Sequence, residues 1–191
     1  MTGKTIEKVK TNLANAVEKL QAGDVIAYPT EAVYGLGCDP FNLLAVEKLF
    51  HVKQRSVEKG VILIAASVEQ VSAYIELQGC AWETEVLASW PGPVTWVLPV
   101  KQSANLPEWI TGGRNSVAIR VSAHPVVQAL CHAFGQAIVS TSANLTAQQP
   151  ARNCTEVKQF FQDSVYCLEG DLGALSQPTQ IRDAVTGRVL R

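Results

Sequence analysis

The chain alternates amphipathic stretches with short apolar runs, which predicts helices and strands in turn. Apolar residues recur every three or four positions between residues 6 and 20, the spacing of one helix face. Gly23 follows this stretch and is typical of a helix C-cap. Residues 25–28 then form a continuous apolar run of strand length, and Pro29 should end its pairing because proline cannot donate to a ladder. The first helix is therefore expected to pack on the first strand.

The rest of the chain repeats this alternation. Further helices are expected at residues 43–52, 67–75, 81–89, 125–134 and 155–161. Ser67 and Gln70 form a capping box for the second of these, and Thr155 can cap the last. Apolar runs predict strands at residues 61–66, 94–99, 116–121, 137–139, 165–168, 180–185 and 189–191. The alternation indicates an α/β fold, and the hairpin at the end of the chain favours a mixed sheet over a wholly parallel one.

A polar turn that contains two glycines is expected where the first strand ends. Gly35 and Gly37 permit close backbone approach, while Thr30, Glu31 and Tyr34 supply hydroxyls and a carboxylate. Loops after strands of α/β proteins often bind ligands, although an ordinary connection to the next helix has the same composition. The turn is therefore a candidate site with a structural alternative.

Length and composition place the chain among globular proteins. It has 191 residues, which suits a single domain over residues 1–191, and its 47% hydrophobic and 17% charged residues argue against disorder. Sixteen Lys and Arg against seventeen Asp and Glu leave a net charge of −1. Overall charge will therefore not attract the protein to nucleic acid or to a membrane.

The cysteines and the N-terminus indicate a reducing, cytoplasmic location. Five cysteines are an odd number without a CxxC pair, which disfavours a disulfide framework and a zinc cluster, so all five are expected to be free thiols. They are Cys38, Cys80, Cys131, Cys154 and Cys167. No signal-peptide core and no apolar stretch of membrane-spanning length is present.

Familiar catalytic motifs are absent from the sequence. It contains no P-loop, no dinucleotide-binding GxGxxG, no HExxH and no GxSxG. His51, His124 and His132 lack metal-ligand spacing and are interpreted as structural or surface residues, so no metal site built by the protein is expected. A P-loop nucleotidase and a common hydrolase are therefore disfavoured.

Three groups of residues remain that suit the binding of anions. Lys53 and Arg55 leave the end of a helix, and they can converge on one ligand only if the helix unwinds there. Arg120 lies within a strand, and residues 140–144 form a turn of small, mostly polar residues. Lysine provides a mobile charge and arginine a bidentate fork, which together suit phosphate and carboxylate. Each group also has an ordinary structural interpretation, as a solvated helix end or a tight turn.

In combination these motifs resemble those of the YrdC-like threonylcarbamoyl-AMP synthases. The resemblance covers the chain from about residue 14 onward and is closest to the short bacterial branch. The matching segments, in family order, are residues 29–37 (PTEAVYGLG), Lys53-x-Arg55, residues 90–95 (WPGPVT), residues 116–120 (SVAIR) and residues 142–144 (SAN).

The resemblance implies a fold, a reaction and a set of site residues. The fold would be a twisted mixed sheet with flanking helices around a concave cavity. The reaction would join L-threonine, bicarbonate and ATP into L-threonylcarbamoyl-AMP and release pyrophosphate, for a separate transferase complex that modifies tRNA. ATP contacts would come from Lys53, Arg55, Lys59, Ser116, Ser142, Asn144 and Arg191, the first two acting in catalysis. Threonine contacts would come from Thr30, Tyr34, Arg120, Ser140 and Thr179.

Two positions depart from the pattern of longer relatives. Ala32 stands where threonine is common, and Ile64 where histidine is common, both expected near the amino-acid pocket. Isoleucine offers no hydrogen bond, so threonine contacts cannot be transferred to these two positions.

The implied reaction agrees with the chemistry of the residues, although a binding function remains as an alternative. A carbamate oxygen would attack the α-phosphorus of ATP, so the protein has to hold two anions together. Cations and oriented amides can do this with magnesium bound through the phosphates, and no nucleophilic side chain is required. The alternative is a factor for double-stranded RNA or ribosome maturation without catalysis. The net charge of −1 disfavours it, and direct tRNA binding is expected to be weak.

Overall fold

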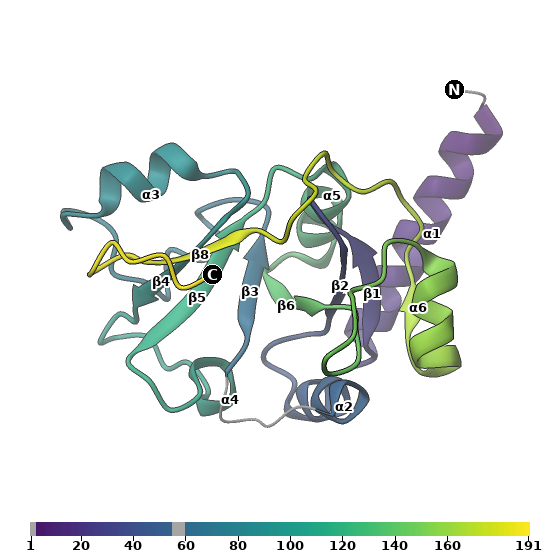
Figure 1. The fold of residues 1–191 in the computed structure, drawn as a ribbon, viewed down its shortest axis with the longest axis horizontal. Coiled ribbons are helices and arrows are strands. Elements are labelled where there is room, and N and C mark those ends of the chain that lie inside the picture. Colours follow the sequence, from purple (N-terminus) through teal and green to yellow (C-terminus); the bar gives the residue numbers. More distant parts are fainter. Residues whose placement is uncertain (1–2, 55–59) are drawn as a thin grey trace.

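The helices and strands of the protein build one mixed sheet with helices around it (Figure 1). The computed structural model describes residues 3–54 and 60–191. Its helices are α1 (Gly3–Gln21), α2 (Leu43–Lys53), α3 (Glu83–Ser89), α4 (Glu108–Thr111), α5 (Pro125–Phe134) and α6 (Cys154–Phe161), followed by a 3-10 turn at Gln162–Ser164. Its strands are β1 (Ile26–Pro29), β2 (Tyr34–Gly37), β3 (Ile62–Ala65), β4 (Val94–Pro99), β5 (Ser116–Val121), β6 (Ile138–Ser142), β7 (Tyr166–Cys167) and β8 (Gln180–Asp183).

The eight strands pair in the order β7-β1-β2-β6-β3-β5-β4-β8. Four pairs are antiparallel (β1–β2, β2–β6, β3–β6 and β4–β5), and three are parallel (β1–β7, β3–β5 and β4–β8). The predicted mixed α/β sheet is therefore confirmed. In Figure 1, α1 and α6 lie at the β7–β1 end of the sheet and α3 at the β4–β8 end.

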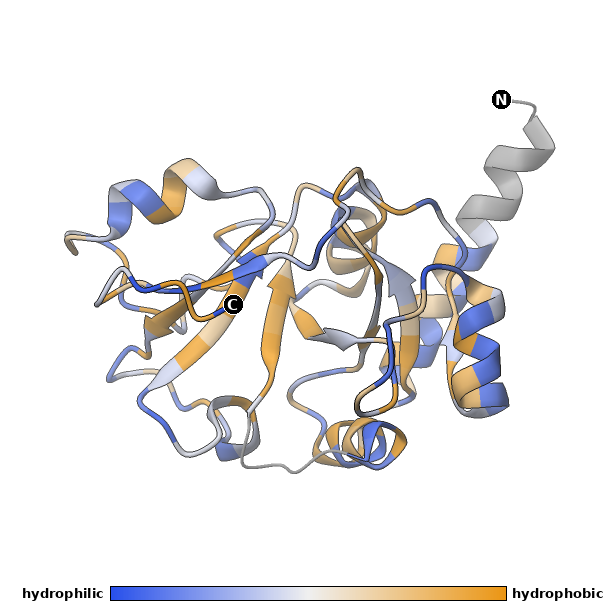
Figure 2. Cartoon of the chain, viewed as in Figure 1, coloured by the Kyte–Doolittle hydropathy of each residue, from blue (hydrophilic) through white to orange (hydrophobic). Residues whose placement is uncertain are grey.

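Two apolar clusters hold the helices to the sheet. Side chains of α1 and α5 pack with Ile26, Tyr28, Ile64 and Ile138 of the strands. A larger cluster joins α2, α3 and α6 to the other apolar strand residues. Figure 2 shows the resulting pattern, with hydrophobic residues in the central strands and mixed character on the helices. No helix in the described part of the chain is long and apolar enough to cross a membrane.

The predicted turn after β1 contains a strand that sequence reasoning missed. Residues 34–37 form β2, which pairs with both β1 and β6, and Pro29 is the last paired residue of β1 rather than the residue after it. Gly37 allows this packing because a Cβ there would lie 2.5 Å from the Val139 carbonyl oxygen and 2.8 Å from the Tyr28 ring. The two glycines that suggested a turn therefore serve close packing between strands.

Helix ends follow local capping chemistry in most cases. Asn42 caps α2 by accepting a hydrogen bond from the Ala45 amide, and Gln54 ends α2 in a left-handed conformation at φ 50°. The α6 cap is Asn153, which accepts from the Glu156 amide, so the prediction of Thr155 was wrong by two residues.

Two predicted elements are absent from the described residues. Residues 67–75 form turns instead of a helix, because the Gln70 side chain is engaged elsewhere and does not cap one. Its oxygen accepts a hydrogen bond from the Ala66 N–H, and its NH2 group donates to the Cys131 carbonyl. Residues 189–191 do not form a strand, and only a single bridge joins Val189 to Arg182.

The structure also corrects the interpretation of the cysteines. Cys154 and Cys167 form a disulfide with a Cα–Cα distance of 5.8 Å, although they are 13 positions apart in the sequence. The pair forms because the start of α6 lies beside β7, which the sequence spacing alone does not reveal. Cys38, Cys80 and Cys131 are free thiols, as expected, and burial raises the pKa of the Cys131 thiol to about 12.

We expect reduction of the Cys154–Cys167 disulfide to destabilise the protein. A bridge that closes a loop of this length stabilises a fold by about 2–4 kcal/mol, chiefly by restricting the unfolded chain. Urea unfolding with and without a thiol reductant should show a loss of that size. The Cys154→Ser/Cys167→Ser double variant, which keeps the three free thiols, should have the same stability with and without the reductant. Equal stability of the wild type in the two conditions would contradict the prediction.

Candidate functional site

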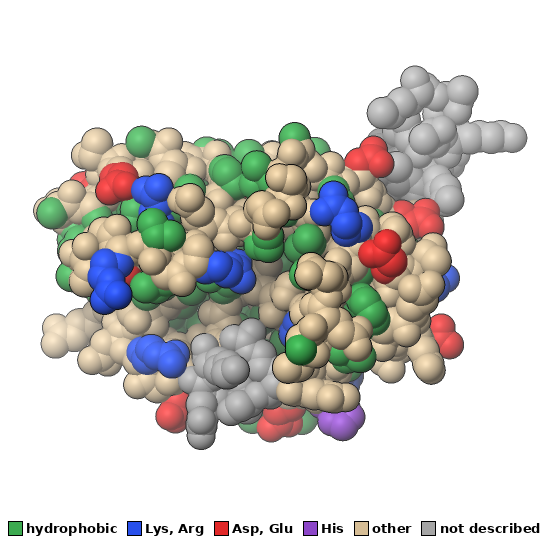
Figure 3. Space-filling view, in the orientation of Figure 1, with side chains coloured by type: hydrophobic (Ala, Val, Ile, Leu, Met, Phe, Trp, Pro, Cys, Tyr) green, Lys and Arg blue, Asp and Glu red, His purple; other side chains and the backbone are tan. Residues whose placement is uncertain are grey.

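A cavity of about 860 Å³ opens between the strands and the C-terminal segment. Figure 3 shows it as a hollow in this face of the molecule, with Lys and Arg side chains gathered beside it. Ten of the twelve predicted site residues belong to the described chain, and all ten line the cavity. They are Thr30, Tyr34, Lys53, Ser116, Arg120, Ser140, Ser142, Asn144, Thr179 and Arg191. The other two, Arg55 and Lys59, lie outside the described residues.

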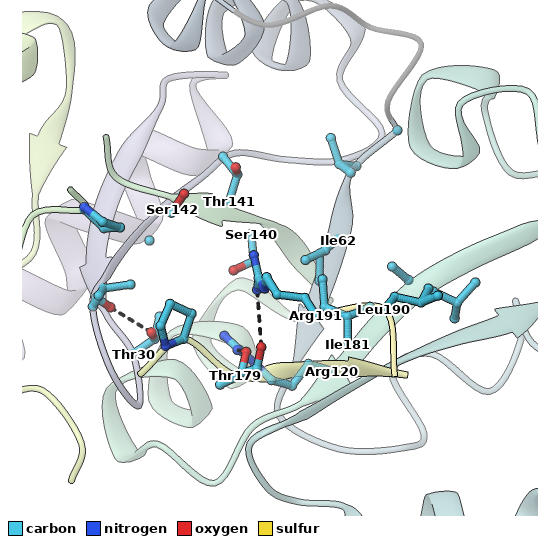
Figure 4. Close-up of a pocket in the computed structure, with 18 of the residues that line it drawn as sticks. Thr30, Ile62, Arg120, Ser140, Thr141, Ser142, Thr179, Ile181, Leu190 and Arg191 are labelled. Atoms are coloured by element: carbon cyan, nitrogen blue, oxygen red, sulfur yellow. Dashed lines mark hydrogen bonds between the residues drawn. The ribbon is translucent and has the colours of Figure 1, made fainter. Parts of the chain in front are cut away.

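Strand geometry explains why residues far apart in sequence meet here. Alternate residues of a strand share a face, so Ser116, Ala118 and Arg120 of β5 all reach the cavity. The end of β6 supplies Ser140 to Ser142, and Thr30 follows β1. Figure 4 shows the β6 residues facing Thr179 and Arg191 across the cavity.

Lys53 is held by the turn that follows β6. Its ammonium donates hydrogen bonds to the Ser142 carbonyl, to the Asn144 carbonyl at 3.0 Å and to the Asn144 side-chain oxygen at 3.0 Å. The residue is only 7% exposed. Because α2 ends at Lys53, its side chain can reach these acceptors, which lie about ninety positions further along the chain.

The turn itself is internally bonded. The Ser142 hydroxyl donates to the Asn144 side-chain oxygen at 2.6 Å, and the Asn144 amide group donates to the carbonyls of Leu145 and Gln148 at 3.0 and 2.9 Å. The Ala143 N–H donates to the Tyr34 carbonyl at 2.9 Å. Lys53 and these bonds thus fix the shape of the turn before any ligand arrives.

Arg120 has two partners that come from distant parts of the chain. One terminal nitrogen donates to the Thr179 hydroxyl at 2.6 Å, and the other lies 3.4 Å from a Glu31 carboxylate oxygen. Both side chains of the ion pair are nearly buried, with exposures of 8% and 10%. Burial of this arginine therefore depends on a carboxylate that the sequence pattern did not connect with it.

Arg191 approaches the same threonine from the C-terminal segment. It donates to the Thr179 carbonyl at 3.3 Å, and Figure 4 shows its side chain reaching toward Ser140. Burial and the positive charge of Arg120 lower the pKa of Arg191. The two guanidinium groups therefore lie close enough to affect each other's charge.

The hydroxyls of Thr30 and Tyr34 already have partners at the cavity wall. The Thr30 hydroxyl donates to the Val33 carbonyl at 2.7 Å. The Tyr34 hydroxyl donates to the Gly170 carbonyl at 2.8 Å and accepts from the Gly170 N–H at 3.2 Å, and burial raises its pKa. Tyr34 therefore ties β2 to the segment that follows β7.

The structure adds Arg114 to the predicted set and leaves Ile64 out of the cavity lining. Arg114 lines the cavity directly after Gly112 and Gly113, which both have left-handed backbone conformations. The only sign of its role in the sequence was a cation two residues before Ser116. Ala32 lies in the lining as expected. Ile64 does not line the cavity, because it is fully buried in the cluster with α1 and α5, but it lies opposite Arg120 in the β3–β5 pair and so is close to the proposed amino-acid position.

Comparison with known proteins gives the family. A family model described as telomere recombination, for Sua5, YciO and YrdC proteins, matches residues 18–191. The chain belongs to this Sua5/YciO/YrdC family. A threonylcarbamoyl-AMP synthase of Aliivibrio fischeri is 52% identical over 183 residues, which cover 94% of this chain and 98% of that protein. One from Halorhodospira halophila is 50% identical over 178 residues, which cover 93% and 92%.

Solved structures of Sua5/YciO/YrdC proteins share the fold. Sua5 of P. abyssi in complex with L-threonine has a TM-score of 0.79 and 30% identity, and the match covers 90% of this chain and 50% of that one. This chain thus spans half the length of that protein. YciO of E. coli has a TM-score of 0.76 and 25% identity, with 90% and 82% covered.

The hydrogen bonds of Lys53 lead to a prediction about stability in this member of the family. In Lys53→Met the apolar stem remains, but the acceptors of Ser142 and Asn144 lose a charged donor. The free energy of unfolding should fall by roughly 1.5–3 kcal/mol, measured by urea unfolding.

The control is Lys101→Met, which removes the same charge. Lys101 also donates to a carbonyl, that of Ser72 at 2.8 Å, but on the exposed surface. Its loss should change stability by no more than about 0.5 kcal/mol. Equal losses in the two variants would show that Lys53 does not stabilise the turn.

Proposed function

We propose that this protein synthesises L-threonylcarbamoyl-AMP from L-threonine, bicarbonate and ATP and releases pyrophosphate. The observation that carries the proposal is the cavity, which is lined by three cationic side chains and two hydroxyls. They belong to Lys53, Arg120, Arg191, Ser140 and Thr179. Curated relatives of nearly the same length, at about 50% identity, bear the name of this enzyme, and a solved relative holds L-threonine.

The reaction needs binding and orientation more than a reactive side chain. The threonine amine and bicarbonate form a carbamate with loss of water. A carbamate oxygen then attacks the α-phosphorus of ATP, the bond to the β-phosphate oxygen breaks, and pyrophosphate leaves with its electron pair. Both reactants are anions and repel each other, so fixed cations lower the free energy of bringing them together.

The residues divide between the two substrates. Threonine contacts are assigned to Thr30, Tyr34, Arg120, Ser140 and Thr179, with Arg120 on the carboxylate and Ser140 at the hydroxyl. ATP contacts are assigned to Lys53, Arg55, Lys59, Ser116, Ser142, Asn144 and Arg191, with Lys53 and Arg55 acting in catalysis. The buried position of Lys53 favours a double role for it, shaping the turn after β6 and adding positive charge beneath the phosphates.

Magnesium belongs to the substrate in this proposal. The described residues contain no group of three or more His, Cys, Asp or Glu side chains that could hold a metal ion. Mg²⁺ commonly binds through substrate phosphates and water with few protein ligands. It would thus enter with ATP and lower the charge of the phosphates.

The wider role follows from the product. A threonylcarbamoyl adenylate is an activated donor, so a transferase complex has to pass its threonylcarbamoyl group to tRNA. We assign the protein to the cytoplasm, where tRNA and ATP are available, and treat residues 1–191 as one domain. With a net charge of −1, direct contact with tRNA would be weak or left to the downstream complex.

Pyrophosphate release from ATP tests the proposal. Release should require both L-threonine and bicarbonate, and omission of either should reduce it to background. Lys53→Ala and Arg120→Ala should each lower the rate about tenfold to a hundredfold, as expected for loss of a charge-assisted contact. A protein that only bound double-stranded RNA would release no pyrophosphate, which would refute the proposal.

The choice of amino acid should depend on the threonine hydroxyl. Serine lacks one methyl group, which a small pocket recognises for about 1–3 kcal/mol, so kcat/KM for serine should fall roughly tenfold to a hundredfold. Valine leaves the partner of the hydroxyl unpaired and should react more slowly than serine. In Ser140→Ala the preference for threonine over valine should shrink, whereas Ser72→Ala, at an exposed hydroxyl, should keep it. Valine reacting faster than serine would show that the hydroxyl is not recognised.

A further inference from the structure

Glu31 has no task in the proposed reaction, yet it is a nearly buried carboxylate at the cavity. One of its oxygens accepts a hydrogen bond from the Ser122 hydroxyl at 2.5 Å, and the other lies 3.4 Å from Arg120. Ser122 also accepts from the His124 N–H at 3.0 Å, which turns its hydroxyl proton toward Glu31. Burial of an ionised carboxylate is unfavourable without such partners, so the arrangement calls for an explanation.

The backbone holds Glu31 in place. The Leu175 N–H donates to its carbonyl at 3.0 Å, and the Gly173 N–H donates to the Thr30 carbonyl at 3.0 Å. Gly173 packs so closely that a Cβ there would lie 2.7 Å from the Glu31 Cα. The carboxylate is therefore a fixed negative charge behind Arg120.

This charge matters because two arginines share one end of the cavity. Arg120 bonds the hydroxyl of Thr179 and Arg191 its carbonyl, as described above. Both guanidinium groups bond the same residue, and burial together with the charge of Arg120 lowers the pKa of Arg191. Without Glu31, a phosphate at Arg120 would meet both guanidinium groups and a charge of +2. Glu31 offsets the charge of Arg120 and leaves that of Arg191, which is assigned to ATP, and an ion pair without net charge suits a zwitterionic amino acid better than a phosphate dianion.

We propose that Glu31 is a specificity residue that makes the Arg120 end of the cavity selective for a carboxylate over a phosphate. The proposal rests on the proposed function, because it explains how one cationic cavity keeps ATP phosphates away from the threonine position. Lys53 and Arg114 line the cavity elsewhere, where Lys53 donates to the oxygens of Ser142 and Asn144 and Arg114 donates to the Thr111 carbonyl at 3.4 Å. In this proposal the polyphosphate of ATP binds in that part of the cavity.

The variant that isolates the charge is Glu31→Gln. Glutamine keeps the shape, and its amide oxygen can face Arg120 while its NH2 group donates to the Ser122 hydroxyl. Inorganic phosphate is mainly a dianion near pH 8 and gains from removal of the negative charge, whereas zwitterionic threonine gains at its carboxylate and loses at its ammonium. The affinity ratio of L-threonine to inorganic phosphate should therefore fall about tenfold. Ser122→Ala, which keeps the Glu31 charge, and Glu85→Gln, which removes the acid paired with Arg182 on the surface, should keep the wild-type ratio.

Calorimetric titration with L-threonine, repeated with inorganic phosphate replacing chloride at constant ionic strength near pH 8, measures this ratio. The wild type should bind threonine equally in both buffers, and phosphate should weaken threonine binding in Glu31→Gln. The inference is overturned if phosphate displaces threonine from the wild type, a result that does not depend on the variant folding. The inference is also overturned if phosphate does not weaken threonine binding to folded Glu31→Gln.

Failure of the proposed function gives a different result. A wild type that binds no L-threonine would refute threonine as the substrate. Direct titration with inorganic phosphate would then still test the charge effect. Tighter phosphate binding by Glu31→Gln than by the wild type would support it, and equal binding would overturn it.

Discussion

The cavity depends on the burial of positive charge. As whole residues, Lys53 and Arg120 are 7% and 6% exposed. Burial of an isolated cation at such a position is strongly unfavourable. Each is retained because oxygen atoms from a distant segment surround it: carbonyls of the turn after β6 for Lys53, and Glu31 with Thr179 for Arg120. The fold must therefore bring these segments together before the cations can be buried at all.

The sheet provides that arrangement. β6 pairs with both β2 and β3, so its polar end lies between the β1–β2 hairpin and the strands that carry Ile62 and Arg120. Because Gly37 has no side chain, β2 can pack closely against Tyr28 and Val139. The segment after β7 then crosses Thr30 and Glu31 through its own backbone hydrogen bonds and leads to Thr179. The polar site is thus a consequence of strand order.

Local signals predicted most elements, and failed where long-range contacts decide the structure. Residues 94–99, 116–121 and 125–134 were predicted to the residue, the first and last of them because Pro or Gly marks their ends. β2 was missed because its glycines serve packing that only the partner strand reveals. The helix expected at 67–75 was wrong because Gln70 finds partners in Ala66 and Cys131, and no local propensity describes such a contact.

The same distinction applies to the site. Eight of the ten described site residues belong to local sequence patterns, whereas Thr179 and Arg191 were named only from the family resemblance, and all ten line the cavity. Their partners were not found, because Lys53 and Asn144 are 91 positions apart, as are Ser122 and Glu31. A carboxylate within a polar turn gives no sign of which arginine it faces until the order of the strands is known. Whether a cation faces a carboxylate is a property of the fold, and in this cavity the strand order places Glu31 beside Arg120.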